Sequence, residues 1–137
     1  AVTMAGQPLA WMEAGGLPDE ALALGREIGR YREVQHDFHS GVILPVGDEP
    51  SGRSWTGFQS LNGDRGYFIF FREQHPDRRT RIGTWLPEGA TVRLTPVLGS
   101  GKAAVRKAGR RGELEVELPS PEDYAMYRYE IIRKPKP

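Results

Sequence analysis

The sequence contains no cysteine and no hydrophobic run long enough to span a bilayer. The absence of cysteine excludes a disulfide framework and thiol chemistry, and it leaves the cytoplasm and an oxidising compartment both open. A membrane-spanning helix needs a run of about 20 apolar residues, and the longest apolar stretches here are much shorter. We therefore expect no membrane partner, and the compartment stays unassigned.

The chain also has almost no net charge, with 19 Lys and Arg residues against 18 Asp and Glu residues. A formal charge of +1 is too small to indicate a polyanionic partner by itself. Basic residues do gather at 78–81 and 102–111, and Trp55, Phe58 and Trp85 occur among the neighbouring strands. A barrel that binds single-stranded nucleic acid would use such groups together. The offsetting acidic residues favour the simpler interpretation, in which the basic residues occupy solvated turns.

The length of 137 residues suits one domain with a short appendage. The chain begins at Ala1 rather than Met and shows no signal peptide, so we expect a fragment, a processed chain or a chain cleaved from a tag. A short apolar stretch from Pro8 to Met12 predicts a buried strand that ends before Gly15 and Gly16. No hairpin partner follows, and a strand that leads directly into a helix is typical of a βα unit with further strands elsewhere.

Residues 18–40 predict one long amphipathic helix. Pro18 suits a first helical position, and Gly41 suits the end of the helix. We expect the helix to pack through Leu24, Ile28 and Tyr31. The apolar stripe comprises Leu17, Ala21, Leu24, Ile28, Tyr31 and Phe38, with Gln35 as its one polar member.

After Gly41 the hydrophobic period changes from that of a helix to that of strands, and turn signals recur. Asn62-Gly63 predicts a hairpin turn between the segments WTGFQSL and GYFIFFRE. This pattern predicts a mainly β protein: an antiparallel β-sandwich of the Greek-key type, preceded by the helix. The expected strands are GVILPV, WTGFQSL, GYFIFFRE, RIGTWL, TVRLTPVL, KAAVRK, GELEVELP and DYAMYRYEII.

Two of the expected strands indicate which of their faces are buried. GELEVELP alternates apolar and acidic residues, which predicts one buried face and one solvated face. GYFIFFRE instead has apolar residues on both faces, so it needs cover on both sides. The helix is one candidate for the second cover, and another domain is the alternative. An uncovered apolar face would favour weak self-association.

The titratable residues indicate no catalytic or metal site. Asp48 and Glu49 are adjacent in a loop rich in Gly and Pro, where they are expected to be solvated rather than held as a catalytic pair. His36 and His39 are spaced to share a helix face, but no third ligand follows at a credible spacing. We therefore expect no metal site and no cofactor.

Three aromatic residues of the strand region, Trp55, Trp85 and Tyr67, are candidates for stacking on sugar rings. Each needs an exposed face for that role. The alternative is that they are large core residues, which is the commoner place for an aromatic residue flanked by strand residues.

The order of motifs resembles the C-terminal region of α-galactosidase-like glycoside hydrolases. In that family, the last strand and helix of the catalytic barrel lead into a C-terminal β-sandwich. The segments GRSWTGFQS and GYFIFFRE are similar to an early hairpin of that sandwich, and GELEVELP is similar to a late strand. The barrel-end motifs are Pro8-Leu9, Leu17-Pro18, Tyr31-Arg32 and Gly41.

The resemblance implies that residues 1–40 are a remnant of the last βα unit of a barrel and that residues 41–137 are the sandwich domain. The family's catalytic carboxylates lie on earlier barrel strands, and no position here matches them. The resemblance therefore implies that this chain alone is not an enzyme, although its parent is a glycoside hydrolase. Only Trp11 and Glu13 fall where a barrel strand could face the sugar pocket.

The implied function is a non-catalytic accessory domain that caps and stabilises the barrel of the same protein. An independent carbohydrate-binding sandwich is the first alternative, and a β-barrel that binds nucleic acid is the second. Exposure of the aromatic residues distinguishes the first two, because capping buries these residues whereas a carbohydrate-binding module displays them.

Overall fold

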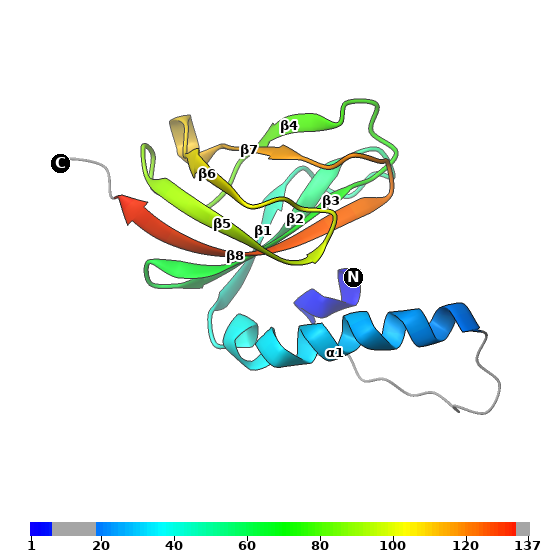
Figure 1. Cartoon of the computed structure of the whole chain (residues 1–137). Coiled ribbons are helices and arrows are strands. Elements are labelled where there is room, and N and C mark those ends of the chain that lie inside the picture. The colour runs from blue at the N-terminus through cyan, green and yellow to red at the C-terminus, as the bar shows by residue number, and fades with distance from the viewer. Residues whose placement is uncertain (7–18, 134–137) are drawn as a thin grey trace.

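The computed structural model describes residues 1–6 and 19–133, and it contains one helix followed by antiparallel sheets (Figure 1). The prediction of a mainly β sandwich preceded by one long helix is therefore confirmed. The elements are η1 (Val2–Ala5), α1 (Asp19–His39), β1 (Val42–Gly47), β2 (Trp55–Asn62), β3 (Arg65–Arg72), β4 (Arg79–Ile82), β5 (Thr91–Gly99), β6 (Ala104–Lys107), η3 (Arg110–Gly112), β7 (Leu114–Glu117) and β8 (Asp123–Arg133).

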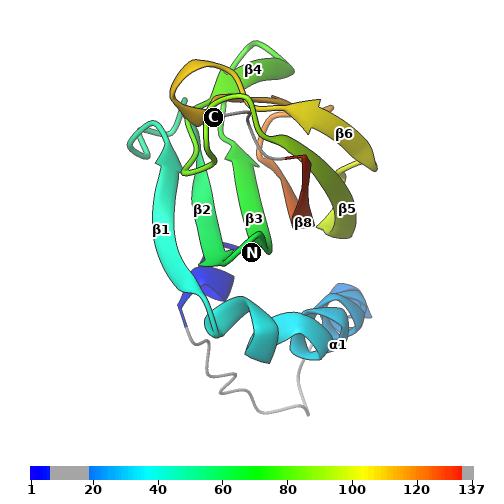
Figure 2. The same ribbon diagram turned by 90° about the vertical axis from the view of Figure 1, so that its left-hand side faces the viewer.

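The larger sheet has six strands in the order β1-β2-β3-β8-β5-β6, and β4 pairs with β7 in a second, smaller sheet. The last strand, β8, lies between β3 and β5, so the chain closes the sheet only when its C-terminal strand is in place. Figure 2 shows the larger sheet curving strongly, with β1 and β6 at its opposite edges. The β4-β7 pair lies across the concave side, and α1 lies across the convex side.

The predicted hairpin forms between β2 and β3, with Asn62 opposite Arg65. Its loop is the two-residue Gly63-Asp64, one residue later than the predicted Asn62-Gly63 turn, and Gly63 adopts φ +63°. Such a backbone conformation favours glycine. In contrast, the strand predicted at RIGTWL is displaced: β4 ends at Ile82, and Trp85 lies in the following loop.

The inner core lies between the concave face of the larger sheet and the β4-β7 pair. Phe68 stacks on Phe70 with ring centroids 4.9 Å apart, and it lies 4.7 Å from the ring of Tyr129. Opposite them, Leu114 and Val116 of β7 are buried. The glutamates that alternate with these residues are partly exposed, as the period of GELEVELP predicted.

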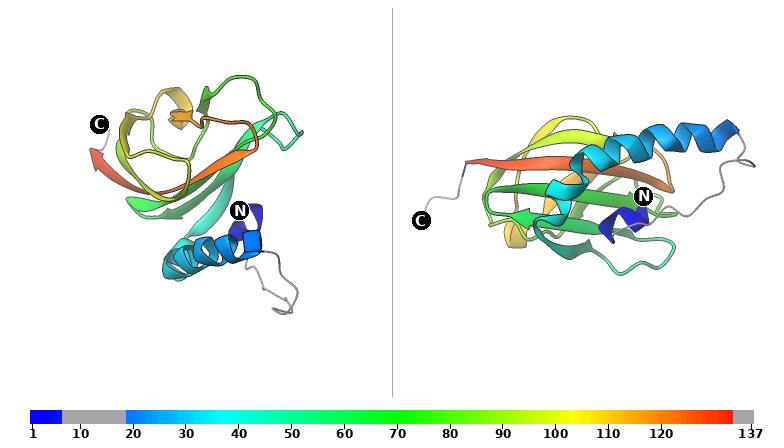
Figure 3. Two further views of the ribbon diagram at one scale, coloured as in Figure 1. Left: turned by 45° about the vertical axis from the view of Figure 1, so that its right-hand side comes forward. Right: turned by 90° about the horizontal axis from the view of Figure 1, so that it is seen from below.

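A second core fills the space between the convex face of the sheet and α1, so β3 is covered on both faces. The helix covers the second apolar face of β3, as the sequence of that strand predicted, and η1 packs beside it (Figure 3). The buried members of this core are Met4, Tyr31, Val34, Phe38, Tyr67, Ile69, Leu98 and Met126.

The predicted packing face of the helix is partly wrong. Tyr31 is buried as expected, but Leu24 is 62% exposed and Ile28 is 40% exposed, while Val34 packs in the core instead. The reason is the position of the helix: Figure 3 shows its N-terminal end extending beyond the strands. The stripe therefore continues past the surface that it would cover. The strand predicted at residues 8–12 lies outside the described residues.

Candidate functional site: the helix–sheet junction

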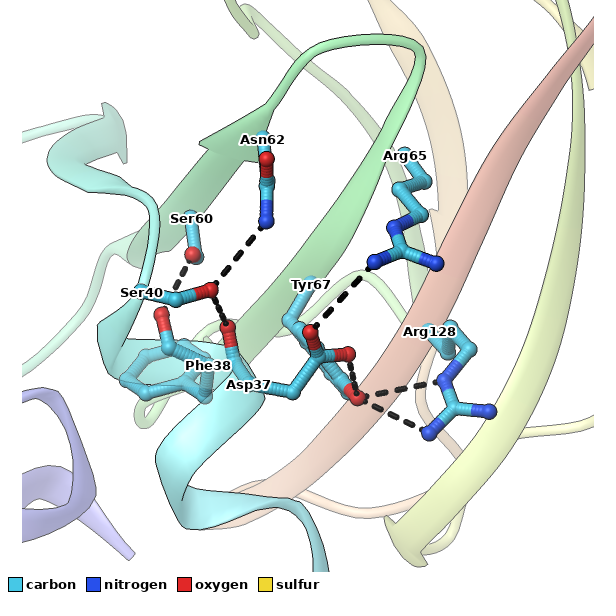
Figure 4. Close-up of polar contacts among 8 residues, drawn as sticks. All are labelled: Asp37, Phe38, Ser40, Ser60, Asn62, Arg65, Tyr67 and Arg128. Carbon is cyan, nitrogen blue, oxygen red and sulfur yellow. Dashed lines mark hydrogen bonds and ion pairs between the residues drawn. The ribbon is translucent and has the colours of Figure 1, made fainter.

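The C-terminal end of α1 is fixed to the sheet by a cluster of polar side chains centred on Tyr67 (Figure 4). The Tyr67 hydroxyl donates to Asp37 Oδ2 at 2.8 Å. The same oxygen accepts hydrogen bonds from Arg128 Nε at 3.1 Å and Nη2 at 2.9 Å. The Arg128 guanidinium also lies 5.5 Å from the Tyr67 ring centroid, a cation–π distance. One hydroxyl group thus joins the helix to strands β3 and β8.

The electrostatics of this cluster keep Tyr67 in its neutral, donating form. Burial raises the pKa of Tyr67, and its hydrogen bond to Asp37 raises it further, while Arg128 acts in the opposite direction. Asp37 occupies the last turn of α1, where the helix dipole disfavours negative charge. The guanidinium of Arg65, 3.9 Å from Asp37 Oδ1, offsets that effect.

Two serine side chains bond carbonyl groups that the end of the helix leaves free, and an asparagine side chain bonds one of these serines. The Ser60 hydroxyl donates to the carbonyl oxygen of Phe38. The Ser40 hydroxyl donates to the carbonyl oxygen of Asp37 at 2.7 Å and accepts from Asn62 Nδ2 at 3.1 Å. These bonds fix where α1 ends relative to the β2-β3 hairpin.

Two further contacts hold the middle of α1. The Tyr124 hydroxyl donates to Glu27 Oε2 at 2.8 Å. The Tyr31 hydroxyl donates to the carbonyl oxygen of Met4 at 2.8 Å, and His39 Nε2 lies 2.9 Å from the same hydroxyl oxygen. The helix is thus hydrogen-bonded to β8 and η1 as well as to β3, so several separate contacts fix its position on the sheet.

The carboxylates outside the junction differ in exposure and in the pKa shifts that their neighbours cause. Asp48 and Glu49 are exposed in the loop after β1, as predicted. Backbone N–H groups, first that of Ser54, hold the pKa of Glu73 below its usual range, and Arg79 and Arg78 lower the pKa of Glu117 to about 2. A general acid in glycoside hydrolysis needs the opposite shift. In the part of the chain that the structure describes, no three His, Asp or Glu residues gather as a metal site.

The structure separates the three predicted stacking residues. Trp55 and Tyr67 are buried, and their polar atoms bond to Asp77 O and to the junction cluster, so neither ring has a face free for a sugar. Both side chains belong to cores, which is the alternative that the sequence left open for them. Trp85 is 56% exposed and donates from Nε1 to the carbonyl oxygen of Pro45 at 2.9 Å.

The pocket candidates Trp11 and Glu13 lie outside the described residues. The junction itself was missed in the sequence, where Tyr67, Asp37 and Arg128 showed no common motif. Comparisons with protein-family models, with curated proteins and with solved structures found no match. Within residues 1–6 and 19–133, no helix has both the length and the apolar character that crossing a membrane requires.

Proposed function

We propose that this chain is a non-catalytic accessory domain of an α-galactosidase-like glycoside hydrolase, in which it caps and stabilises a catalytic barrel of the same protein. Residues 1–40 would belong to the last βα unit of that barrel, and residues 41–137 would form the C-terminal sandwich. The family resemblance is the origin of the proposal, and the exposed part of α1 is the structural observation that supports it.

That observation is the apolar overhang, which we define as Leu24 and Ile28. Both belong to the same stripe as the buried Tyr31, yet both are exposed, and the N-terminal end of α1 extends beyond the strands (Figure 3). Large apolar side chains that continue a packing stripe past its partner are typical of a surface that another body covers. The last helix of a barrel has such a partner, because it packs on the barrel strands.

The junction cluster explains how binding at the overhang could stabilise a barrel. Asp37, Tyr67 and Arg128 fix the helix to the sheet, so the helix and the sandwich would behave as one rigid body. A partner that binds the overhang would therefore also be held in place relative to the sandwich. A barrel that docks on one half of α1 would then be stabilised by the folded sandwich on the other half.

The overhang can be tested with the double variant Leu24→Ser/Ile28→Ser, made both in this chain and in the protein translated from its full reading frame. We expect little change in the melting temperature of the isolated chain. In the longer protein the variant should melt several degrees lower, because each Leu or Ile side chain buried at the interface stabilises it by about 2 kcal/mol.

The matched control is Val105→Ser, which removes an exposed apolar side chain of β6 at the far edge of the sheet. It should leave both proteins unchanged. Equal melting temperatures for the double variant and wild type in the longer protein would refute docking through α1. A reading frame without a barrel-length segment before Ala1 would refute the proposal as a whole.

The proposal also predicts that the purified chain hydrolyses neither α- nor β-glycosides. Nitrophenyl glycosides of common hexoses are a sufficient panel, with the product measured by absorbance. Turnover that persists in protein free of contaminating hydrolases, and that survives replacement of Glu13, Asp48 and Glu49, would reveal a catalytic site that the proposal denies.

An independent carbohydrate-binding module is the second candidate, and the exposure of Trp85 favours it. One face-exposed indole supplies a stacking platform for a pyranose ring. Titration with neutral oligosaccharides should then shift the tryptophan fluorescence, and Trp85→Ala should abolish the shift. An unchanged spectrum at millimolar oligosaccharide would exclude this second candidate.

A further inference from the structure

The sandwich is open along one side, between β6 of the larger sheet and β7 of the smaller one. These two strands are not paired to each other, and a cavity of about 380 Å³ lies between them and the neighbouring loops. This volume is within the range of small-molecule sites. The residues that line the cavity are Arg78, Leu94, Ser100, Lys102, Ala103, Ala104, Arg106, Glu115, Val116, Glu117, Pro119 and Tyr127.

Arg106 is the residue that distinguishes this cavity. Successive side chains of β6 alternate, so the exposed Val105 faces outward while Arg106 faces the cavity. Its Nη1 donates to the carbonyl oxygen of Val105 at 3.2 Å. Its Nε is buried and has no hydrogen-bond partner, and it is the only such side-chain atom among the described residues. The Arg106 guanidinium therefore forms no hydrogen bond to another side chain of the described residues.

Some charged side chains around the cavity form ion pairs with each other, and others do not. Glu117 is already paired, with Arg78 Nη2 at 2.6 Å and Arg79 Nη2 at 2.8 Å from its two oxygens. In contrast, neither Lys102 nor Arg106 forms an ion pair within the described residues. The β6 side of the cavity therefore carries two unneutralised cations, whereas the β7 side carries carboxylates.

The walls between these charges include apolar side chains as well as polar ones. Leu94, Val116 and Tyr127 are buried side chains that line the cavity, and their burial gives it a firm floor. Ser100 adds a hydroxyl group at the rim, although this group already donates to Asp123 Oδ1. A ligand that fits must place an anionic group at the β6 side and a compact, largely uncharged body over the floor.

We propose that this cavity binds a small monocarboxylate with a hydroxylated body, of the size of a single hexuronate ring. The planar guanidinium of Arg106 matches a carboxylate, and Arg106 lines the cavity without an ion-pair partner among the described residues. Hydroxyl groups of the ligand can donate to Glu115 on the opposite wall. A phosphate dianion would place twice the negative charge of a carboxylate near Glu115 and Glu117, and these glutamates would repel it more strongly.

The ligand site is independent of the capping function, since the cavity lies on the opposite side of the sheet from α1. It can therefore be tested on this chain alone. The probes are D-glucuronate, neutral D-glucose with the same ring, and D-glucose 6-phosphate as the dianion. Binding is measured by calorimetry and by amide chemical-shift changes in β6 and β7.

We expect saturable glucuronate binding with shifts confined to β6, β7 and the 100–104 loop, and binding of glucose and the phosphate at least tenfold weaker. Arg106→Gln should weaken glucuronate binding at least tenfold. The matched control is Arg93→Gln, which removes an arginine of β5 that is bonded to Glu130 and does not line the cavity. It should bind like wild type.

Three results would overturn the proposal: no saturation with glucuronate, equal binding of glucose or the phosphate, or equal losses in the Arg106 and Arg93 variants. Melting curves establish that each variant is folded. If Arg106→Gln does not fold, Arg106→Lys keeps the charge but not the planar fork, and it must still weaken glucuronate binding for the assignment to hold.

Discussion

Replacing Phe38 by alanine tests whether the second core is what attaches α1 to the sandwich. Phe38 is fully buried at the C-terminal end of the helix, and its ring lies edge-on to Tyr67 with centroids 5.9 Å apart. It makes two further edge contacts, with Tyr31 at 6.5 Å and His39 at 5.0 Å. Among the described side chains of α1, none has more aromatic ring contacts.

The size of the effect follows from the buried area. Burying a phenylalanine removes at least 150 Å² of apolar surface from water, which is worth roughly 4 kcal/mol at 25 cal/mol per Å². Phe→Ala changes in cores cost about 3–5 kcal/mol, which agrees with this value. For a domain of this length, each kcal/mol lowers the melting temperature by about 4 °C, so we expect a fall of about 15 °C.

The assay is urea unfolding followed by circular dichroism, with Leu24→Ala as the control on the same helix. Leu24 is mostly exposed, so its replacement should change the free energy of unfolding by less than about 0.5 kcal/mol. A loss below 1 kcal/mol for Phe38→Ala, or equal losses for the two variants, would show that α1 is not held through this face.

Three further predictions concern the junction and the backbone. Tyr67→Phe should cost about 1–3 kcal/mol of unfolding free energy, because Asp37 and Arg128 lose partly buried hydrogen bonds to its hydroxyl; a loss under about 0.5 kcal/mol by urea titration would contradict the central role of that hydroxyl. Gly57→Ala should prevent folding, because an added Cβ would overlap the carbonyl oxygen of Ile69, whereas Gly25→Ala, with open space around it, should stabilise the helix by up to about 1 kcal/mol. Burial first, and then the bond to a glutamate, raises the pKa of Tyr124 to about 12, so the stabilising effect of its neutral hydroxyl is complete below pH 10 and is lost as the pH rises toward 12. Tyr124→Phe should flatten that decline in melting curves, and an unchanged pH profile would show that the tyrosine is not responsible.

The strands were predictable from the sequence because their signals are local. Alternation of apolar and acidic residues in GELEVELP corresponds to the buried and partly exposed positions of β7. The double apolar character of GYFIFFRE correctly indicated that β3 needs cover on both faces, and α1 supplies one of the two covers. Residue type and period are sufficient for such statements, since they depend on neighbours within a few positions.

The helix face and the site were harder to predict because they depend on distant parts of the chain. The stripe through Leu24 and Ile28 is regular, but periodicity does not say where the sheet beneath a helix ends. Tyr67 and Arg128 meet because β3 and β8 pair in a register that places them opposite each other, 61 residues apart in sequence. The unpaired Nε of Arg106 similarly depends on the alternation of β6 and on how far β7 lies from it.

The position of α1 affects where the domain boundary of this chain should be placed. The boundary predicted between residues 40 and 41 passes through the second core, because Tyr31 and Phe38 on one side of it pack in the same core as Tyr67 and Ile69 on the other. A sandwich cut at that point would expose the convex face of β3 and leave the Tyr67 hydroxyl without Asp37. The helix therefore belongs to the folding unit of the sandwich, whatever covers its N-terminal half. For a capping domain this is the favourable arrangement, because a helix shared by two bodies couples the stability of one to the other.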